Sequence, residues 1–180
     1  YYNLRRVAMI RKHLTSEALA RAIQATVTSR LDFHNGLLAG LPEKSLARQQ
    51  ILQNHAAWLL TGTNRRAHIT PVLSQLHWLP VKSRVSYKIL MIVHKTLHCS
   101  TIPQYLRDLI TLYQPRRDLR SSQDHWTLKV SRHTRQCGNR FFQVHGAKLW
   151  NALPADLRKP QSVQTFKTKL KTFLYRQAFL

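Results

Sequence analysis

The sequence predicts a mainly α-helical protein, a helical bundle with a smaller irregular or β segment at about residues 113–145 and a C-terminal helix. Three observations carry this prediction. Apolar residues recur at spacings of three and four along much of the 180-residue chain. Small polar capping residues precede several of these stretches. Only 5 Gly and 7 Pro interrupt them, so the chain can bury a substantial core.

Two long helices are predicted in the first third of the chain. The first covers Glu17–Leu38, where Thr15 and Ser16 precede a regular apolar spacing. Gly40 and Pro42 end it. The second covers Glu43–Leu60, ahead of Gly62. The first of the two is amphipathic in its residue pattern.

The next segment, His68–Pro80, contains no Asp, Glu, Lys or Arg although the chain carries a formal net charge of +22. Thr70 is expected to cap a short helix with Pro71 in its first position. Val81–His98 follows as a helix that is apolar over most of its girth and therefore central to the core. Trp78 has two readings, a core residue or a base-stacking platform. The residues expected to be buried here are Trp78, Ile89, Ile92 and Leu97.

The last third of the chain has a different residue pattern. Trp126, Leu128 and Val130 alternate as in an edge strand, and Arg140–Val144 is a candidate partner for it. Ser162 then caps a helix over Val163–Tyr175. We therefore expect two regions, a helical domain at residues 1–110 and a basic loop and strand segment with a C-terminal helix at residues 111–180.

The net charge of the chain predicts the kind of partner that it binds. The chain has 29 Lys and Arg against 7 Asp and Glu, so most cations lack an acidic partner within it. Nucleic acid is the expected polyanion, because each neutralised phosphate releases counterions, whereas anionic lipid usually attracts a short basic cluster beside a membrane anchor. No base-specific contact is predicted. The candidate phosphate-binding residues are Arg65, Arg66, Arg116, Arg117, Arg120, Arg132, Arg135 and Arg140.

Other features limit the cellular setting. The longest apolar run, Ile89–Val93, is far shorter than the roughly 20 residues that a membrane span requires, and the first residues lack a signal-peptide pattern. We expect an intracellular protein, in nucleus or cytoplasm. The 2 Cys agree with a reducing compartment. The chain starts at Tyr1, which suggests a piece of a longer protein.

The sequence gives little support for a catalytic site or a metal site. His94, His98 and Cys99, with His133 or Cys137, are a weak alternative as zinc ligands, because their spacing matches no compact zinc module. Cys137 near His133 lacks an orienting acid for a nucleophile pair. No phosphate-binding glycine loop or HExxH motif is present. No cofactor and no catalytic residue is predicted.

Several motifs resemble one known family. They are "SRLDFHNGLLAGLP" from Ser29, "HITPVLSQLHWLPV" from His68, "SYKIL" from Ser86, "LRSS" from Leu119 and "LWNALPADLR" from Leu149 with "FKTKLKTFL" from Phe166. In this order they resemble the C-terminal region of the reverse transcriptase polyprotein of jockey-like non-LTR retrotransposons (LINE elements). The resemblance covers nearly the whole chain.

The resemblance implies a thumb and post-polymerase segment, with residues 1–110 as a thumb-like domain that holds an RNA, DNA or hybrid duplex by its backbone. The parent polymerase domain would be a partner. Two-metal polymerisation needs closely placed carboxylates, and the sequence offers no convincing pair, so the chain alone is not expected to be an enzyme. The alternative is a decayed or truncated remnant of such an element that acts, if at all, as a structural or protein-interaction domain.

Overall fold

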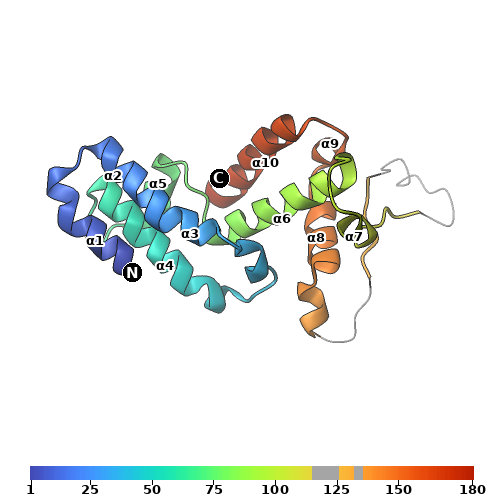
Figure 1. The fold of residues 1–180 in the computed structure, drawn as a ribbon, viewed down its shortest axis with the longest axis horizontal. Helices are drawn as coiled ribbons and strands as arrows, with labels where there is room; N and C mark the ends of the chain where they lie inside the picture. Colours follow the sequence, from blue (N-terminus) through green and yellow to red (C-terminus); the bar gives the residue numbers. More distant parts are fainter. Residues whose placement is uncertain (115–125, 132–135) are drawn as a thin grey trace. The chain divides into compact units, whose positions relative to one another are not determined.

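The computed structural model describes residues 1–114, 126–131 and 136–180, which are mostly helical (Figure 1). The predicted mainly α-helical class is confirmed. The chain divides into two compact units, unit 1 (Tyr1–Val85 and Leu174–Leu180) and unit 2 (Ser86–Phe173). Among the helices of the described ranges, none is both long and apolar enough to cross a bilayer.

Unit 1 is built on α4 (Glu43–Thr61), which contacts three other elements of the unit. Two small hydrophobic clusters hold the unit together, one around Ile23 and Ala56 and one around Ala57 and Leu73. Trp78 packs against both clusters. The other helical elements are α1 (Tyr2–Ile10), η1 (Arg11–His13), α2 (Ser16–Ile23), the π-helical η2 (Gln24–Thr28), α3 (Ser29–Asp32), η3 (Asn35–Leu38) and α5 (Ile69–Gln75).

The long helix predicted for Glu17–Leu38 is interrupted twice. It begins as expected, because the Thr15 hydroxyl accepts a hydrogen bond from the Ala18 N–H at 3.2 Å. It then widens into the π-helical η2 and ends after α3, where His34 adopts the left-handed conformation with φ of 55°. Only the short 3-10 helix η3 follows. The apolar spacing continues through this break, so periodicity alone could not reveal it.

The predicted cap at Thr70 is wrong. Helix α5 begins at Ile69 with His68 as its N-cap, which places Pro71 inside the first turn, where its missing N–H costs nothing. Trp78 is half-buried rather than fully buried, and it follows His77, whose φ is 52°. Its contacts with both clusters favour the core reading of Trp78 over the stacking platform.

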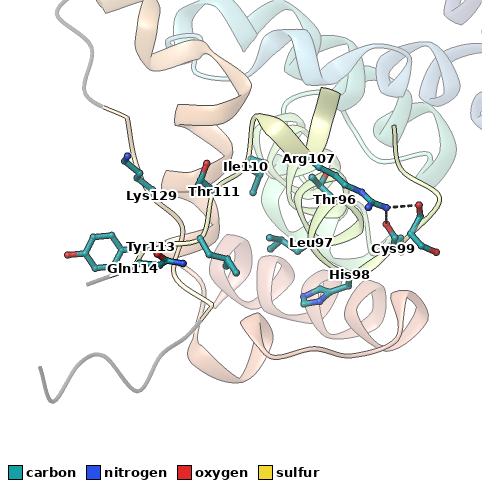
Figure 2. Close-up of a pocket in the computed structure, with 12 residues that line it drawn as sticks. Thr96, Leu97, His98, Cys99, Arg107, Ile110, Thr111, Tyr113, Gln114 and Lys129 are labelled. Atoms are coloured by element: carbon teal, nitrogen blue, oxygen red, sulfur yellow. Dashed lines mark hydrogen bonds between the residues drawn. The ribbon is translucent and has the colours of Figure 1, made fainter. Parts of the chain in front are cut away.

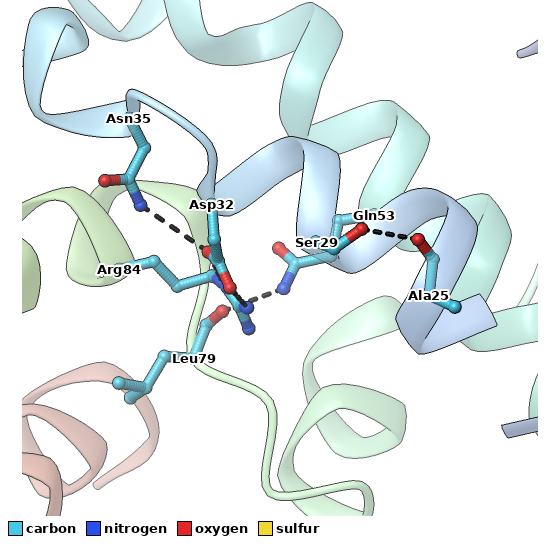
Figure 3. A network of polar contacts seen from close by, with 7 residues as sticks. All are labelled: Ala25, Ser29, Asp32, Asn35, Gln53, Leu79 and Arg84. Carbon is cyan, nitrogen blue, oxygen red and sulfur yellow. Dashed lines mark hydrogen bonds and ion pairs between the residues drawn. The ribbon is translucent and has the colours of Figure 1, made fainter. Parts of the chain in front are cut away.

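A polar network joins the interrupted helix to the residues that lead into α6 (Val81–His98) (Figure 3). Arg84 binds the Asp32 carboxylate through two nitrogens, with Nε at 2.8 Å from Oδ1. The buried Gln53 amide donates to the Leu79 carbonyl at 2.8 Å. Asn35, also buried, donates to Asp32 at 3.5 Å. These bonds satisfy the two buried amide nitrogens, whereas Asn35 Oδ1 has no hydrogen-bond partner among the described residues.

Unit 2 contains most of α6 and most of α10 (Val163–Phe179). The His94 ring on α6 stacks on Phe166 of α10, with centroids 4.0 Å apart, and Trp150 lies beside both rings. Gly146 lets α8 approach α6 closely. The remaining elements are α7 (Gln104–Asp108), η5 (Gln136–Arg140), α8 (Phe142–Asn151) and α9 (Ala155–Arg158).

Two expectations for this unit are corrected. Arg140–Val144 does not pair with the Trp126 segment, because α8 begins at Phe142. Leu128 instead forms an isolated antiparallel bridge with Leu112, supported by backbone hydrogen bonds of 2.8 Å on either side. In α6, Ile89 is buried as predicted. Ile92 and Leu97 are only half-buried.

Gly146→Val tests the contact between α8 and α6. A Cβ at Gly146 would lie 3.1 Å from Val93 Cγ2, so a branched side chain must push the two helices apart. We expect the free energy of unfolding, measured by urea denaturation, to fall by about 1 to 3 kcal/mol. The matched control is Gly36→Val, because a Cβ at Gly36 meets nothing within 4 Å. Equal losses in both variants would contradict the packing described.

Candidate nucleic-acid interface

Arg65 and Arg66 lie in a turn between α4 and α5 in unit 1. Gly62 ends α4 in the left-handed conformation, and its N–H donates to the Trp58 carbonyl at 2.9 Å. The Asn64 side chain then accepts from the Arg66 N–H at 3.0 Å. Both Arg side chains are exposed, as a phosphate-binding role requires.

A third cation, Arg11 of η1, lies against this turn. A Cβ at Gly62 would lie 2.8 Å from Nη2 of Arg11, so the Arg11 guanidinium rests against that glycine. Three residues span at most about 11 Å, which places Arg65 near it. Lys12 is the next residue and is exposed. We call Arg11, Lys12, Arg65 and Arg66 the Gly62 cluster.

The solvent face of α10 within unit 2 is a second basic surface. Phe166 and Leu170 are fully buried, and Lys167, Lys169 and Lys171 are exposed. Because two residues turn an α-helix by about 200°, Lys169 lies on one side of the buried stripe and Lys167 and Lys171 lie on the other. The sequence from residue 163 to residue 173 contains no Asp or Glu. The hydroxyls of the intervening Thr residues donate to helix carbonyls, so the ammonium groups are the strong donors here. We call Lys167, Lys169 and Lys171 the α10 lysine face.

Four of the five acidic side chains in the described ranges are paired with cations outside these surfaces, and the fifth, Asp108, accepts a hydrogen bond from Gln104 at 2.9 Å. Asp32 is held by Arg84, as shown above. The Lys82 ammonium, by hydrogen bond and charge, lowers the pKa of Glu43 below its usual value. The other pairs are Arg21–Glu17 at 2.6 Å, Lys82–Glu43 at 2.7 Å and Lys159–Asp156 at 3.1 Å. These acids therefore do not neutralise either basic surface.

The remaining predicted Arg residues are only partly placed. Arg140 ends η5 in unit 2 and is exposed. Arg116, Arg117, Arg120, Arg132 and Arg135 lie outside the described residues. Since Arg65 and Arg66 belong to unit 1, one phosphate path shared by all eight Arg stays a prediction.

Unit 2 also holds a cavity of about 910 Å³ at the C-terminal end of α6 (Figure 2). Arg107 closes one side by donating to the carbonyls of Cys99 and Ser100 at 3.0 and 2.5 Å. These bonds satisfy carbonyls at the helix end. Lys129 and Tyr113 stand on another side. None of the described lining residues is acidic, so the cavity suits a neutral or anionic group.

The zinc alternative gains no support from the described residues, among which no group of three His, Cys, Asp or Glu could hold a metal ion. His133 and the Cys137 side chain lie outside the description. His94 is fully buried against Phe166, and neither ring nitrogen has a partner in hydrogen-bonding geometry. Burial, followed by the proximity of His98, lowers the pKa of His94 to about 4, and the backbone at Gln161 opposes this fall only in part. The ring is therefore a neutral core group.

No protein-family model, curated protein or solved structure matches the chain.

Burial of His94 predicts a pH-dependent stability. The unfolded chain binds a proton near pH 6.5 while the folded chain resists it until about pH 4, so acid favours unfolding. We expect the free energy of unfolding to fall by up to about 3 kcal/mol between those pH values.

Urea denaturation at a series of pH values measures this loss. His94→Leu, close to isosteric and apolar, should reduce the dependence, while His98 and His145, whose pKa burial also lowers, keep the remainder. The exposed His13→Leu should leave the dependence in place. A profile identical in wild type and His94→Leu would show that other groups cause it.

Proposed function

We propose that this chain binds the phosphate backbone of RNA, DNA or hybrid duplexes without sequence preference, through the Gly62 cluster and the α10 lysine face. The observation that carries the proposal is the separation of charge: exposed cations gather on these surfaces while nearby acids are paired with other residues. Each such cation is available to displace a counterion from a phosphate.

The same surfaces fit a lipid headgroup layer less well. A helix that lies on a membrane inserts its apolar face between the headgroups. In α10 that face is already occupied, because Phe166 and Leu170 are buried in the core of unit 2. Only the lysines remain outside, which suits contact with a phosphate backbone.

The sequence resemblance to the C-terminal region of LINE-type reverse transcriptases supports the same proposal. In such a protein, a thumb and the segment after it lie beside the duplex that the polymerase extends. A thumb holds that duplex by shape and backbone, which needs exposed cations rather than base-reading side chains. The polymerase chemistry would belong to the parent protein and not to this chain.

Neutralising the α10 lysine face tests the proposal. Lys167→Gln, Lys169→Gln and Lys171→Gln together should reduce the slope of log affinity against log salt concentration on duplex by up to about 2.7 units, at about 0.9 per phosphate. Fluorescence anisotropy with a labelled duplex measures the slope. Thermal stability should barely change because exposed charges contribute little to it.

The matched control removes three cations that already have acidic partners, Arg21→Gln, Lys82→Gln and Lys159→Gln. Net charge changes equally in both triple variants, so any difference reports direct phosphate contact. An equal loss of slope in the two variants would show that the effect comes from the net charge of the chain and not from direct contact between these lysines and phosphates. An unchanged slope in the α10 variant would place the phosphate path elsewhere.

A further inference from the structure

A cavity of about 310 Å³ opens in unit 1 between α1 and the π-helical η2. Its volume is at the low end for small-ligand sites, about 300 to 1,000 Å³. Apolar side chains including Leu31 and Leu52 line it together with Thr26, and Tyr1, Tyr2 and Arg30 also contribute to its wall. Apolar, aromatic and cationic groups therefore share one small space.

The cavity lies where the helix departs from α-helical geometry. Thr26 and Val27 of η2 are part of its wall. The Thr26 hydroxyl donates to the Ala22 carbonyl at 2.6 Å, and the Thr26 carbonyl accepts from the Asn3 amide at 3.4 Å. Single π-helical turns inside α-helices occur frequently at functional sites.

The two tyrosines keep most of their surface open to solvent and yet have ring contacts. Tyr2 is 72% exposed, and the Arg6 guanidinium lies 5.7 Å from its ring centroid. Tyr1 meets His55 edge to face, with centroids 5.8 Å apart. Two exposed aromatic rings held beside a cavity can receive another flat ring.

Arg30 supplies the positive charge in the wall of this cavity. It lies on α3, which is secured by the Ser29 hydroxyl bond to the Ala25 carbonyl at 2.5 Å and by the Asp32–Arg84 ion pair (Figure 3). Arg30 is exposed, and the described residues of the cavity wall include no acid. A guanidinium in this position can hold a phosphate next to a bound ring.

We propose that this cavity receives an unpaired nucleobase of a single-stranded nucleic acid, with the base against Tyr1 or Tyr2 and its phosphate on Arg30. The inference rests on the proposed function and extends it from phosphate contact to base contact. A paired base cannot leave its stack without cost, so the site acts on single-stranded segments. Stacking is indifferent to base identity because every base has a π face.

The test compares two labelled single strands of equal length, one with adenine bases and one abasic throughout, so that phosphates are matched. Wild type should bind the adenine strand about 5- to 160-fold more tightly than the abasic strand, the range expected for stacking of one base. This ratio should persist at high salt, since stacking releases no counterions.

Tyr1→Ala and Tyr2→Ala together should reduce the ratio, and Arg30→Gln should weaken binding of both strands and reduce the single-strand salt slope by about 0.7. Phe33→Ala is the matched control, because Phe33 is 72% exposed, as Tyr2 is, but does not line the cavity. Equal ratios in wild type and the double tyrosine variant, or a loss confined to Phe33→Ala, would overturn the proposal.

Two further outcomes separate the possible failures. A steep salt slope with no preference for the adenine strand would overturn the base site and leave phosphate binding intact. A shallow slope on both strands would overturn the proposed function itself. A competition experiment adds free adenosine monophosphate to the bound strand. If the nucleotide displaces the strand at a concentration equal to that of the strand's bases, the occupant of the cavity is a free nucleotide and the proposal of a single strand is overturned.

Discussion

Seven carboxylates must coexist with 29 Lys and Arg side chains, and this imbalance constrains every helix of the chain. An unpaired ammonium or guanidinium cannot be buried without a large desolvation cost, so each helix needs an apolar stripe for the core and an outer face for its cations. In α10 the division is complete, with Phe166 and Leu170 inside and three lysines outside. The positive charges left on this surface repel one another, and this repulsion is what favours the proposed binding of a polyanion.

The Asp32–Arg84 pair has a different role. The Arg84 side chain is largely buried and binds one carboxylate through two nitrogens, an arrangement that fixes geometry more than a single contact does. It ties the end of α3 to the first turn of α6, while Gln50 accepts from the Val81 N–H at 2.9 Å nearby. The interrupted helix that carries Arg30 is therefore held at its end by this ion pair.

Sequence patterns predicted those elements whose local signals agree with their packing. Helices α4 and α6 follow their apolar spacing closely, and Gly62 ends α4 as expected. The break at His34 could not be predicted from the sequence pattern. A left-handed non-glycine residue and a π-helical turn depend on tertiary contacts, which leave no trace in the local spacing of apolar residues. The sequence pattern predicts a strand where helix α8 begins, because its short apolar stretch fits both the helical and the strand spacing. At the candidate interface, local clustering in the sequence predicts Arg65 and Arg66 as candidates, whereas Arg11 has no such signal because only folding brings it to Gly62.

The central claim is that unpaired cations on this fold meet phosphates directly, and the most direct measurement of it is the salt dependence of duplex binding by the unmodified chain. Affinity for a fixed duplex would be measured by anisotropy from about 50 to 300 mM monovalent salt. A footprint of about five to eight phosphates predicts a slope of log affinity against log salt of roughly −4 to −7. A slope near −1 or shallower, or weak binding even at the lowest salt, would contradict the account and favour a structural or protein-interaction remnant.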